Sequence, residues 1–256
     1  MNKIIYKLMI KMCNSSFFQK NLVRFTRSNF SRHFINMYIK KFGINTDELT
    51  KDPSQYISLN DFFTRDISPD DRPIDKNKSV FISPCDGNLS HLGFVSENSK
   101  FTIKGKEYSI NELLNSKDIE RLNGGIYCLI YLSPANYHRF HAMADCKLIN
   151  QYSLGRTSEP VNEIGLKYGN NPIVKNYRIV QELEDMMGNR FYVIYIGAVN
   201  VNSIQIHDND HYSKGEELGY FQFGSSIMIL FPNSLVENLV NANSKINMGQ
   251  AIFKYI

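Results

Sequence analysis

The sequence contains no tryptophan, only four cysteines and no long uninterrupted run of apolar residues. Because a helix needs about 20 apolar residues to cross a bilayer, we do not expect a membrane-spanning helix. The cysteines lie far apart, without the Cys-x-x-Cys spacing of many zinc sites and without the density of a disulfide-bonded scaffold. They are Cys13, Cys85, Cys128 and Cys146. The sequence therefore indicates a protein of a reducing compartment and gives no sign of a metal site.

Acidic residues are also missing from the start of the chain, where nine lysines and arginines precede the first acid, Asp47. The rest of the chain carries the other 20 basic residues and all 25 acidic ones, so a basic arm precedes a mildly acidic body. Apolar residues recur at helical spacing in residues 4–12 and 18–38. Lysines interleaved through the first of these runs argue against a secretory signal.

The arm, residues 1–58, is predicted to be helical and to touch a membrane. An amphipathic helix with a cationic face and bulky apolar residues opposite it suits an anionic bilayer surface. Phenylalanine and methionine, which are frequent here, suit lipid better than phosphate. Two other interpretations stay open, namely helices packed on the core and an arm that touches nucleic acid.

Beyond residue 58 the pattern changes to short apolar runs broken by Gly, Pro, Asn and Asp. Such runs predict strands, at residues 80–83, 126–132, 191–206, 220–223 and 227–231. Short helices are predicted at residues 110–115 and 235–240. With 256 residues, 43% of them hydrophobic, the chain can bury one substantial core. The predicted fold class is α+β, with a helical basic arm followed by a mainly antiparallel β core at 59–256.

Four segments of this core carry chemically useful residues in a fixed order. They are SPCDG at 83–87, YLSPANYHRFH at 131–141, GAVNVNSI at 197–204 and LGYFQFGSS at 218–226. An acid, a histidine pair and a serine next to a glycine are the parts of a serine-activating relay. Each segment alone is ordinary, because Asp-Gly and Gly-Ser pairs are frequent in turns and most histidines are not catalytic.

Together the segments resemble the bacterial membrane-associated phosphatidylserine decarboxylases, from about Leu59 to the C-terminus. Further matching segments are FFTR at 62–65, DRPI at 71–74, KGKEYS at 104–109, NEIGLKYG at 162–169 and NYR at 176–178. The resemblance implies a barrel-like sandwich core. It also implies a proenzyme that makes its own pyruvoyl group and needs no external cofactor or metal.

By this resemblance the chain cuts itself between Gly224 and Ser225. The serine hydroxyl attacks the preceding carbonyl and converts the amide into an ester, with His141 as the base and Asp86 orienting it. Elimination from the ester leaves dehydroalanine, which hydrolyses to pyruvoyl with loss of ammonia. The products are a β chain, residues 1–224, and an α chain, residues 225–256. The resemblance does not say how such αβ units associate further.

The implied reaction is decarboxylation of phosphatidylserine to phosphatidylethanolamine in phospholipid biosynthesis, through a Schiff base to the pyruvoyl group of Ser225. His138 is predicted as the proton donor, although i and i+3 face opposite sides of a strand, so His138 and His141 share a site only if the segment turns. Arg139 is a candidate contact for the lipid phosphate. Further basic candidates are Arg65, Arg72, Lys167 and Arg178. The expected partners are phosphatidylserine and an anionic membrane surface, with peripheral attachment on the cytoplasmic side and no nucleic acid.

The chain departs from the family pattern at the cut site. The commonest motif is Leu-Gly-Ser-Thr, whereas this chain has Phe223-Gly224-Ser225-Ser226. The Gly-Ser bond and a following hydroxyl are kept, so we expect processing to survive. Two alternatives stay open, namely a serine hydrolase that uses Ser225, His141 and Asp86 on an external ester, and a lipid-binding homologue that never cuts itself.

Overall fold

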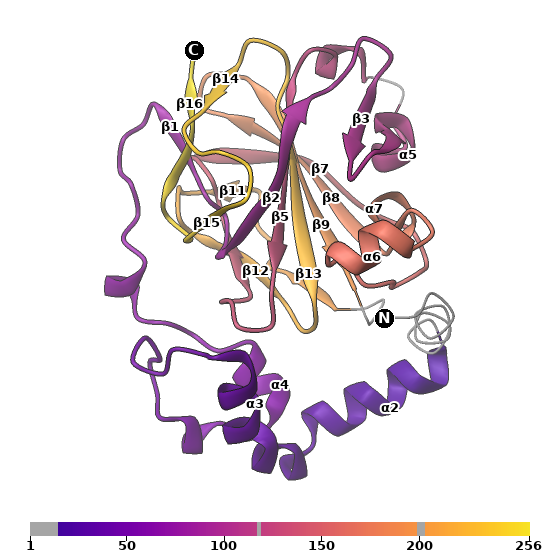
Figure 1. Cartoon of the computed structure of the whole chain (residues 1–256). Coiled ribbons are helices and arrows are strands. Elements are labelled where there is room, and N and C mark those ends of the chain that lie inside the picture. Colours follow the sequence, from indigo (N-terminus) through magenta and orange to yellow (C-terminus); the bar gives the residue numbers. More distant parts are fainter. Residues whose placement is uncertain (1–14, 117–118, 199–202) are drawn as a thin grey trace.

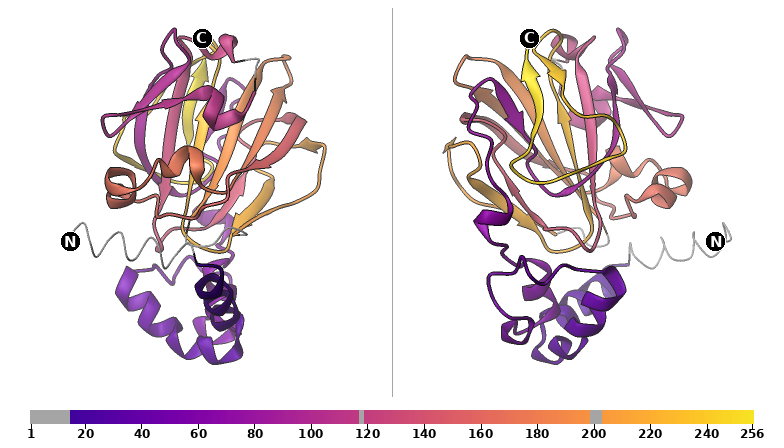
Figure 2. Two further views of the ribbon diagram at one scale, coloured as in Figure 1. Left: turned by 90° about the vertical axis from the view of Figure 1, so that its right-hand side faces the viewer. Right: turned by 60° about the vertical axis from the view of Figure 1, so that its left-hand side comes forward.

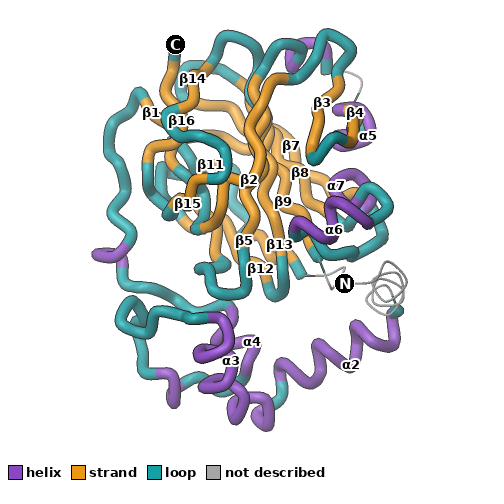
Figure 3. The backbone as a smooth tube through the Cα atoms, in the orientation of Figure 1, coloured by secondary structure: helices purple, strands orange, loops and turns teal. Residues whose placement is uncertain are grey.

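The computed structural model describes residues 15–116, 119–198 and 203–256 (Figure 1). The predicted helical run at 4–12 and Cys13 lie outside the described residues. The helices of the N-terminal arm gather at one end of the molecule, and a few short helices flank the strands that form the rest, as the colouring by secondary structure shows (Figure 3). The α+β class predicted from the sequence is therefore confirmed.

The N-terminal arm is helical where it is described. Its elements are α2 (Ser16–Arg27), η1 (Asn29–Phe34), α3 (Ile35–Phe42), η2 (Pro53–Gln55), α4 (Leu59–Phe63) and η3 (Pro69–Asp71). Gly43 ends α3 in the left-handed conformation that glycine adopts without strain. Both additional views place the arm against one end of the β core (Figure 2). None of the helices in the described parts of the chain is long and apolar enough to cross a membrane.

One large antiparallel sheet forms the centre of the core. Its strands lie in the order β11 (His211–Tyr212), β7 (Cys146–Leu154), β8 (Arg178–Asp185), β9 (Arg190–Gly197), β13 (Ser225–Leu230), β5 (Ile126–Leu132), β2 (Gly87–Phe94) and β15 (Ser244–Ile246). Strand β13 lies between β9 and β5, and all of its residues are buried. A strand covered on both faces is apolar along its whole length, which explains the continuous run that follows Ser226.

Two small sheets form a second layer over one face of the large sheet. They contain β10 (Ile204–Ile206), β12 (Glu217–Phe221) and β6 (Arg139–His141), and β1 (Val80–Ile82), β16 (Ala251–Tyr255) and β14 (Val236–Asn238). Side chains of both layers form one buried cluster, which we call the inner core. A second buried cluster, the outer core, covers the opposite face beneath β3 (Lys100–Ile103), β4 (Lys106–Ser109), α5 (Ile110–Leu114), η4 (Glu120–Leu122), α6 (Glu163–Tyr168) and α7 (Pro172–Lys175).

Most of the predicted core elements are present, with shifted ends. The strands at 80–83 and 126–132 and the helix at 110–115 are confirmed as β1, β5 and α5. The strand predicted at 191–206 is two strands, β9 and β10, and β9 ends at Gly197. The helix predicted at 235–240 is wrong, because this segment pairs as β14 with β16 near the C-terminus. Its apolar spacing fits both structures, and pairing with a distant strand decided between them.

Candidate active site

The segment before Ser225 connects the two layers of the core. Strand β12 belongs to the second layer and β13 to the large sheet, so residues 222–224 cross from one to the other. The backbone N–H of Gln222 donates to the carbonyl of Ser203 at 2.7 Å. The backbone N–H of Ala198 donates to the carbonyl oxygen of Gly224 at 2.9 Å. The Gly224–Ser225 peptide bond is thus held at its carbonyl oxygen by a backbone donor from the end of β9.

Ser225 is fully buried and its hydroxyl faces the inner core. It lies opposite Leu132 of β5 in the ladder, and directly opposite residues of an antiparallel pair share a face. Leu132 belongs to the inner core, together with Phe140 and Tyr195. The Ser225 Oγ atom has no hydrogen-bond partner among the described residues. A buried hydroxyl without a partner costs about 1–3 kcal/mol, so such an atom calls for a functional explanation.

His138 comes directly before β6, on the same side of this extended segment as the inner core. Phe140 packs on Tyr195 of the large sheet with ring centroids 4.2 Å apart, and in an extended segment His138 shares the face of Phe140. The Nδ1 atom of His138 lies 2.8 Å from the carbonyl of Asn136, and a carbonyl only accepts, so Nδ1 carries the hydrogen. The Nε2 lone pair is buried and has no partner in the described part of the chain. Burial, and then the charge of Arg65, lower the pKa of His138 to about 3.

His141 occupies the opposite face, where every ring nitrogen is bonded. Its Nδ1 lies 2.9 Å from the carbonyl of Gly215, and its Nε2 lies 3.1 Å from the hydroxyl of Tyr137. The carbonyl accepts from Nδ1, so Nε2 is the basic nitrogen and accepts from Tyr137. Burial lowers the pKa of His141, while the bond to Gly215 and the charges of Glu217 and Asp86 oppose this shift.

Asp86 is held in a buried ion pair with Arg72. Arg72 donates from Nε and Nη2 to the two carboxylate oxygens at 2.8 and 2.7 Å, and the backbone N–H of Met248 donates to Oδ1 at 2.9 Å. Arg72 also pairs with Glu48 at 2.8 Å. The side chains of Asp86 and Arg72 are 5% and 9% exposed. The charge of Asp86 thus opposes the lowering of the His141 pKa by burial, but the Asp86 carboxylate is bonded to Arg72. The orienting role of Asp86 stays a prediction.

Arg139 is engaged by carboxylates. Its guanidinium lies 3.1 Å from Asp66 and 3.1 Å from Glu217, and it also donates to the carbonyl of Thr64. A lipid phosphate would have to compete with both acids, and the predicted phosphate contact stays a prediction. Of the other basic candidates, Arg65 and Arg178 are buried and donate to backbone carbonyls.

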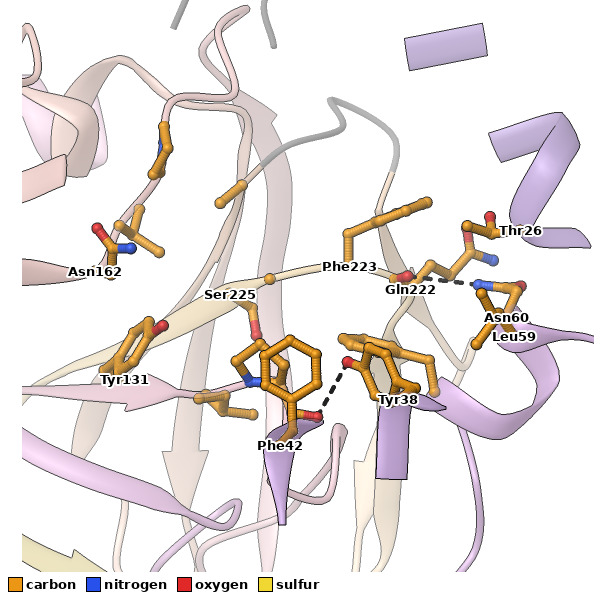
Figure 4. A pocket seen from close by; sticks show the side chains of 17 residues that line it. Thr26, Tyr38, Phe42, Leu59, Asn60, Tyr131, Asn162, Gln222, Phe223 and Ser225 are labelled. Atoms are coloured by element: carbon orange, nitrogen blue, oxygen red, sulfur yellow. Dashed lines mark hydrogen bonds between the residues drawn. The ribbon is translucent and has the colours of Figure 1, made fainter. Parts of the chain in front are cut away.

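A cavity of about 400 Å³ opens beside the Gly224–Ser225 bond, between the arm and the core (Figure 4). The arm contributes mainly apolar and aromatic side chains from α3 and α4, and the core contributes the ends of β5, β9 and β13. The lining residues that matter here are Tyr38, Phe42, Leu59, Phe63, Tyr131 and Ser225. Phe63 also packs against His138 with the two rings tilted by 39° and their centroids 3.9 Å apart. The cavity is therefore lined by apolar side chains and by Ser225, and the ring of Phe63 lies between the cavity and His138.

Sequence reasoning missed two parts of this site. The donor on Gly224 is the backbone N–H of Ala198, and a backbone group leaves no side-chain signal in a sequence. The partner of Asp86 is Arg72, which the sequence suggested only as one basic residue among several. Arg72 belongs to the DRPI segment that carries part of the resemblance, but nothing in that segment indicates a pairing with an acid 14 positions away.

Comparisons with known proteins agree with the geometry. A family model described as phosphatidylserine decarboxylase matches residues 59–254. A phosphatidylserine decarboxylase proenzyme of Geobacillus sp. (strain WCH70) is 39% identical over 239 residues, which cover 93% of this chain and 92% of the relative. Proenzymes of the same description from Anoxybacillus flavithermus and Bacillus thuringiensis subsp. konkukian are each 38% identical. They cover 98% of this chain and 96% and 97% of the respective relatives.

Proposed function

This chain belongs to the phosphatidylserine decarboxylase family, and we propose that it becomes active by cutting itself between Gly224 and Ser225. It is an enzyme that decarboxylates phosphatidylserine to phosphatidylethanolamine in phospholipid biosynthesis. The site of the cut, the group formed there and the roles of individual residues are the proposal. The observation that carries it is the buried, unpaired hydroxyl of Ser225 beside a carbonyl that Ala198 already holds.

Self-cleavage needs a nucleophile, a polarised carbonyl and room for attack. The Ser225 Oγ atom attacks the Gly224 carbonyl carbon, the C–N bond breaks, and the acyl group moves from nitrogen to oxygen. Negative charge develops on the Gly224 oxygen during attack, where the N–H of Ala198 already donates. A Cβ atom at position 224 would meet nothing within 4 Å, so packing of the uncut chain does not require the glycine there. The absence of a side chain instead leaves the carbonyl open to the hydroxyl.

We assign the base for this step to His141, as the resemblance implies, and base strength supports the assignment. Glu217 and Asp86 favour the protonated form of the His141 ring. His138 has a pKa of about 3 and lies under the influence of Arg65, so it is a much weaker base. To take the serine proton, His141 has to give up its bond with Tyr137 and move toward the inner-core side, where the Ser225 hydroxyl lies, so the assignment requires a rearrangement of residues 137–141. After the acyl shift, loss of the Ser225 α-proton expels the Gly224 carboxylate, and hydrolysis of the resulting enamine releases ammonia.

The residues around Ser225 fit the pyruvoyl group that this sequence of steps leaves. The group begins the α chain in a buried, apolar place next to the cavity, and its ketone supplies a sink for the electron pair that carbon dioxide leaves behind. His138 is the proposed proton donor in decarboxylation. The low pKa of His138 keeps its ring neutral near pH 7 in the uncut chain, so this role requires that the Nε2 atom take up a proton once the substrate is bound.

The two chains would stay associated after the cut. The α chain contributes β13, which pairs on one side with β5 and on the other with β9, both from the β chain. Cutting before Ser225 leaves residues 226–230 of β13 paired on both sides. We therefore propose a β–α heterodimer held by a central strand.

The arm supports attachment to a membrane surface. Large apolar side chains are left exposed on it, including Phe17, Phe30, Met37 and Ile57 at 77%, 64%, 59% and 64% exposed. Basic residues lie along the same segment, and the cavity opens between this arm and the core. Contact with an anionic bilayer would cover the apolar groups and bring the phospholipid substrate to the cavity. We propose peripheral attachment on the cytoplasmic side.

The proposal is tested by a denaturing gel with intact-mass analysis of the freshly made protein. We expect two chains, one ending at Gly224 and one that begins at position 225 with a ketone in place of the amino nitrogen. Ser225→Ala removes the nucleophile and should give a single uncut chain without decarboxylase activity. Ser226→Ala, which removes the neighbouring hydroxyl on the opposite face, is the matched control and should still cut. Normal cutting of the Ser225→Ala protein would refute the proposed site.

A further inference from the structure

Gln222, the third residue before the proposed cut, is bonded to the arm at two points. Arg27, at the end of α2, donates from Nη2 to the side-chain oxygen of Gln222 at 2.9 Å. Asn60 of α4 approaches the backbone carbonyl of Gln222 with its Nδ2 atom at 3.4 Å (Figure 4). On the core side, the Gln222 N–H donates to Ser203. Gln222 is only 7% exposed, so these bonds fix a buried position.

The position of this segment matters because it crosses between two layers without a ladder of its own. Phe221 is the last residue of β12 and Ser225 the first of β13, so the segment takes its bonds from wherever its neighbours provide them. The core provides Ser203 and Ala198, and the arm provides Arg27 and Asn60. Attack by Ser225 requires reacting atoms within about 3–3.5 Å, and a misplacement of about 1 Å costs about 100-fold in rate.

We propose that the arm positions the cleavage segment, with Arg27 and Asn60 as positioning residues that act through Gln222. This inference rests on the proposed self-cleavage and adds a requirement to it. The arm must be docked on the core before the chain can cut itself. A cationic, apolar arm that binds a membrane thereby also prepares the bond that is cut, which couples activation of the enzyme to correct placement of its arm.

The test compares rates of self-cleavage of the full-length chain, measured as the fraction cut against time after synthesis. Arg27→Ala should slow cutting about ten-fold, since a hydrogen bond from a charged donor contributes about that much when it is fully used. Arg24→Ala is the matched control, because Arg24 lies one turn earlier on the same helix and is exposed as Arg27 is, whereas the bond to Gln222 comes from Arg27. It removes the same charge from the arm and should cut at the wild-type rate.

Rescue and coupling separate positioning from a general loss of stability. Arg27→Lys keeps a cationic donor and should restore most of the rate. Gln222→Ala should slow cutting as Arg27→Ala does, and the double variant should be no slower than either single one, because both remove the same contact. Additive effects, or equal slowing by Arg24→Ala and Arg27→Ala, would overturn the inference.

The outcomes also distinguish this inference from the proposal beneath it. If the wild-type chain cuts but Arg27→Ala cuts equally fast, the arm does not position the segment and self-cleavage stands. If the wild-type chain never cuts, or Ser225→Ala cuts normally, the proposed cleavage itself fails.

Discussion

Two histidines three residues apart lie in opposite environments. His138 faces the inner core, where its Nε2 atom and the Ser225 hydroxyl are both buried and unpaired among the described residues. His141 faces a polar group of side chains in which its ring nitrogens are bonded to Gly215 and Tyr137. On one side of this segment, therefore, buried polar atoms lack hydrogen-bond partners among the described residues. On the other side, both nitrogens of the histidine ring are hydrogen-bonded.

The difference indicates a division of labour. Buried polar atoms are normally hydrogen-bonded in folded proteins. The unpaired Ser225 hydroxyl and His138 Nε2 atom are therefore candidates to bond the reacting groups or the substrate. The His141 imidazole is the stronger base, because nearby carboxylates favour its protonated form, and its bond to the Gly215 carbonyl fixes one tautomer. Base strength favours His141 for the cut, and the shared face with Ser225 favours His138 for the decarboxylation that follows. Variants of each histidine test the two assignments separately.

The largest expected effect comes from replacing each histidine by alanine. His141→Ala should leave the chain uncut, because the serine proton then has no acceptor of adequate strength. His138→Ala should still cut but should decarboxylate at least 100-fold more slowly per molecule of cut enzyme, which is the usual worth of a general acid. A gel measures the cut, and the yield of phosphatidylethanolamine measures the reaction.

Tyr137→Phe is the matched control for this pair. It removes the hydroxyl that occupies the Nε2 atom of His141 and leaves the stacked ring in place. If His141 acts as the base, this variant should cut at least as fast as the wild type. Identical behaviour of the two alanine variants would abolish the proposed division of labour.

The next effect is on stability and concerns the buried ion pair behind His141. Asp86→Ala removes the two carboxylate oxygens that accept from Arg72 Nε and Nη2 and the oxygen that accepts from the Met248 N–H, and we expect a loss of about 3 kcal/mol in the free energy of unfolding. Glu48→Ala removes the other partner of Arg72, but Glu48 is 28% exposed, so its loss should cost about 1 kcal/mol or less. Denaturant unfolding of both variants in the uncut Ser225→Ala chain provides the comparison. Equal losses would mean that Asp86 is not the main anchor of Arg72.

The sequence was sufficient to predict those features of the fold that depend on local patterns. The alternation and apolar runs predicted β1 and β5, and helical spacing predicted the arm helices that are described. The opposite faces of His138 and His141 also follow from the two-residue period of a strand. These features need no knowledge of distant partners.

Features that depend on distant partners were not predictable in this way. The segment at 235–240 became a strand because β16 offers a pairing edge, and the same apolar residues would suit a helix. Ala198 holds the Gly224 carbonyl only because β9 and β13 are neighbours in the sheet. Arg27 reaches Gln222 across 195 positions of sequence. Such contacts follow from the packing of layers, which a single sequence does not encode in any local pattern.

The smallest expected effect is a pH dependence of stability that isolates the inner-core compartment. The pKa of His138 is about 3 in the folded chain, against 6.5 for a free imidazole, so below pH 6.5 the unfolded chain binds a proton that the folded chain does not. The stabilising contribution is complete above about pH 6.5 and is lost progressively as the pH falls toward 3. At pH 5 the loss amounts to about 2 kcal/mol.

Unfolding free energies of the uncut Ser225→Ala chain at pH 7.5 and pH 5, with and without His138→Gln, measure this contribution directly. The added substitution removes the titrating group, so the fall between the two pH values should shrink by about 2 kcal/mol. All other histidines are the same in both proteins, so their contributions cancel in the difference. An unchanged fall would mean that His138 is hydrated or already paired in solution. The unpaired nitrogen would then no longer distinguish the compartment of Ser225 from that of His141.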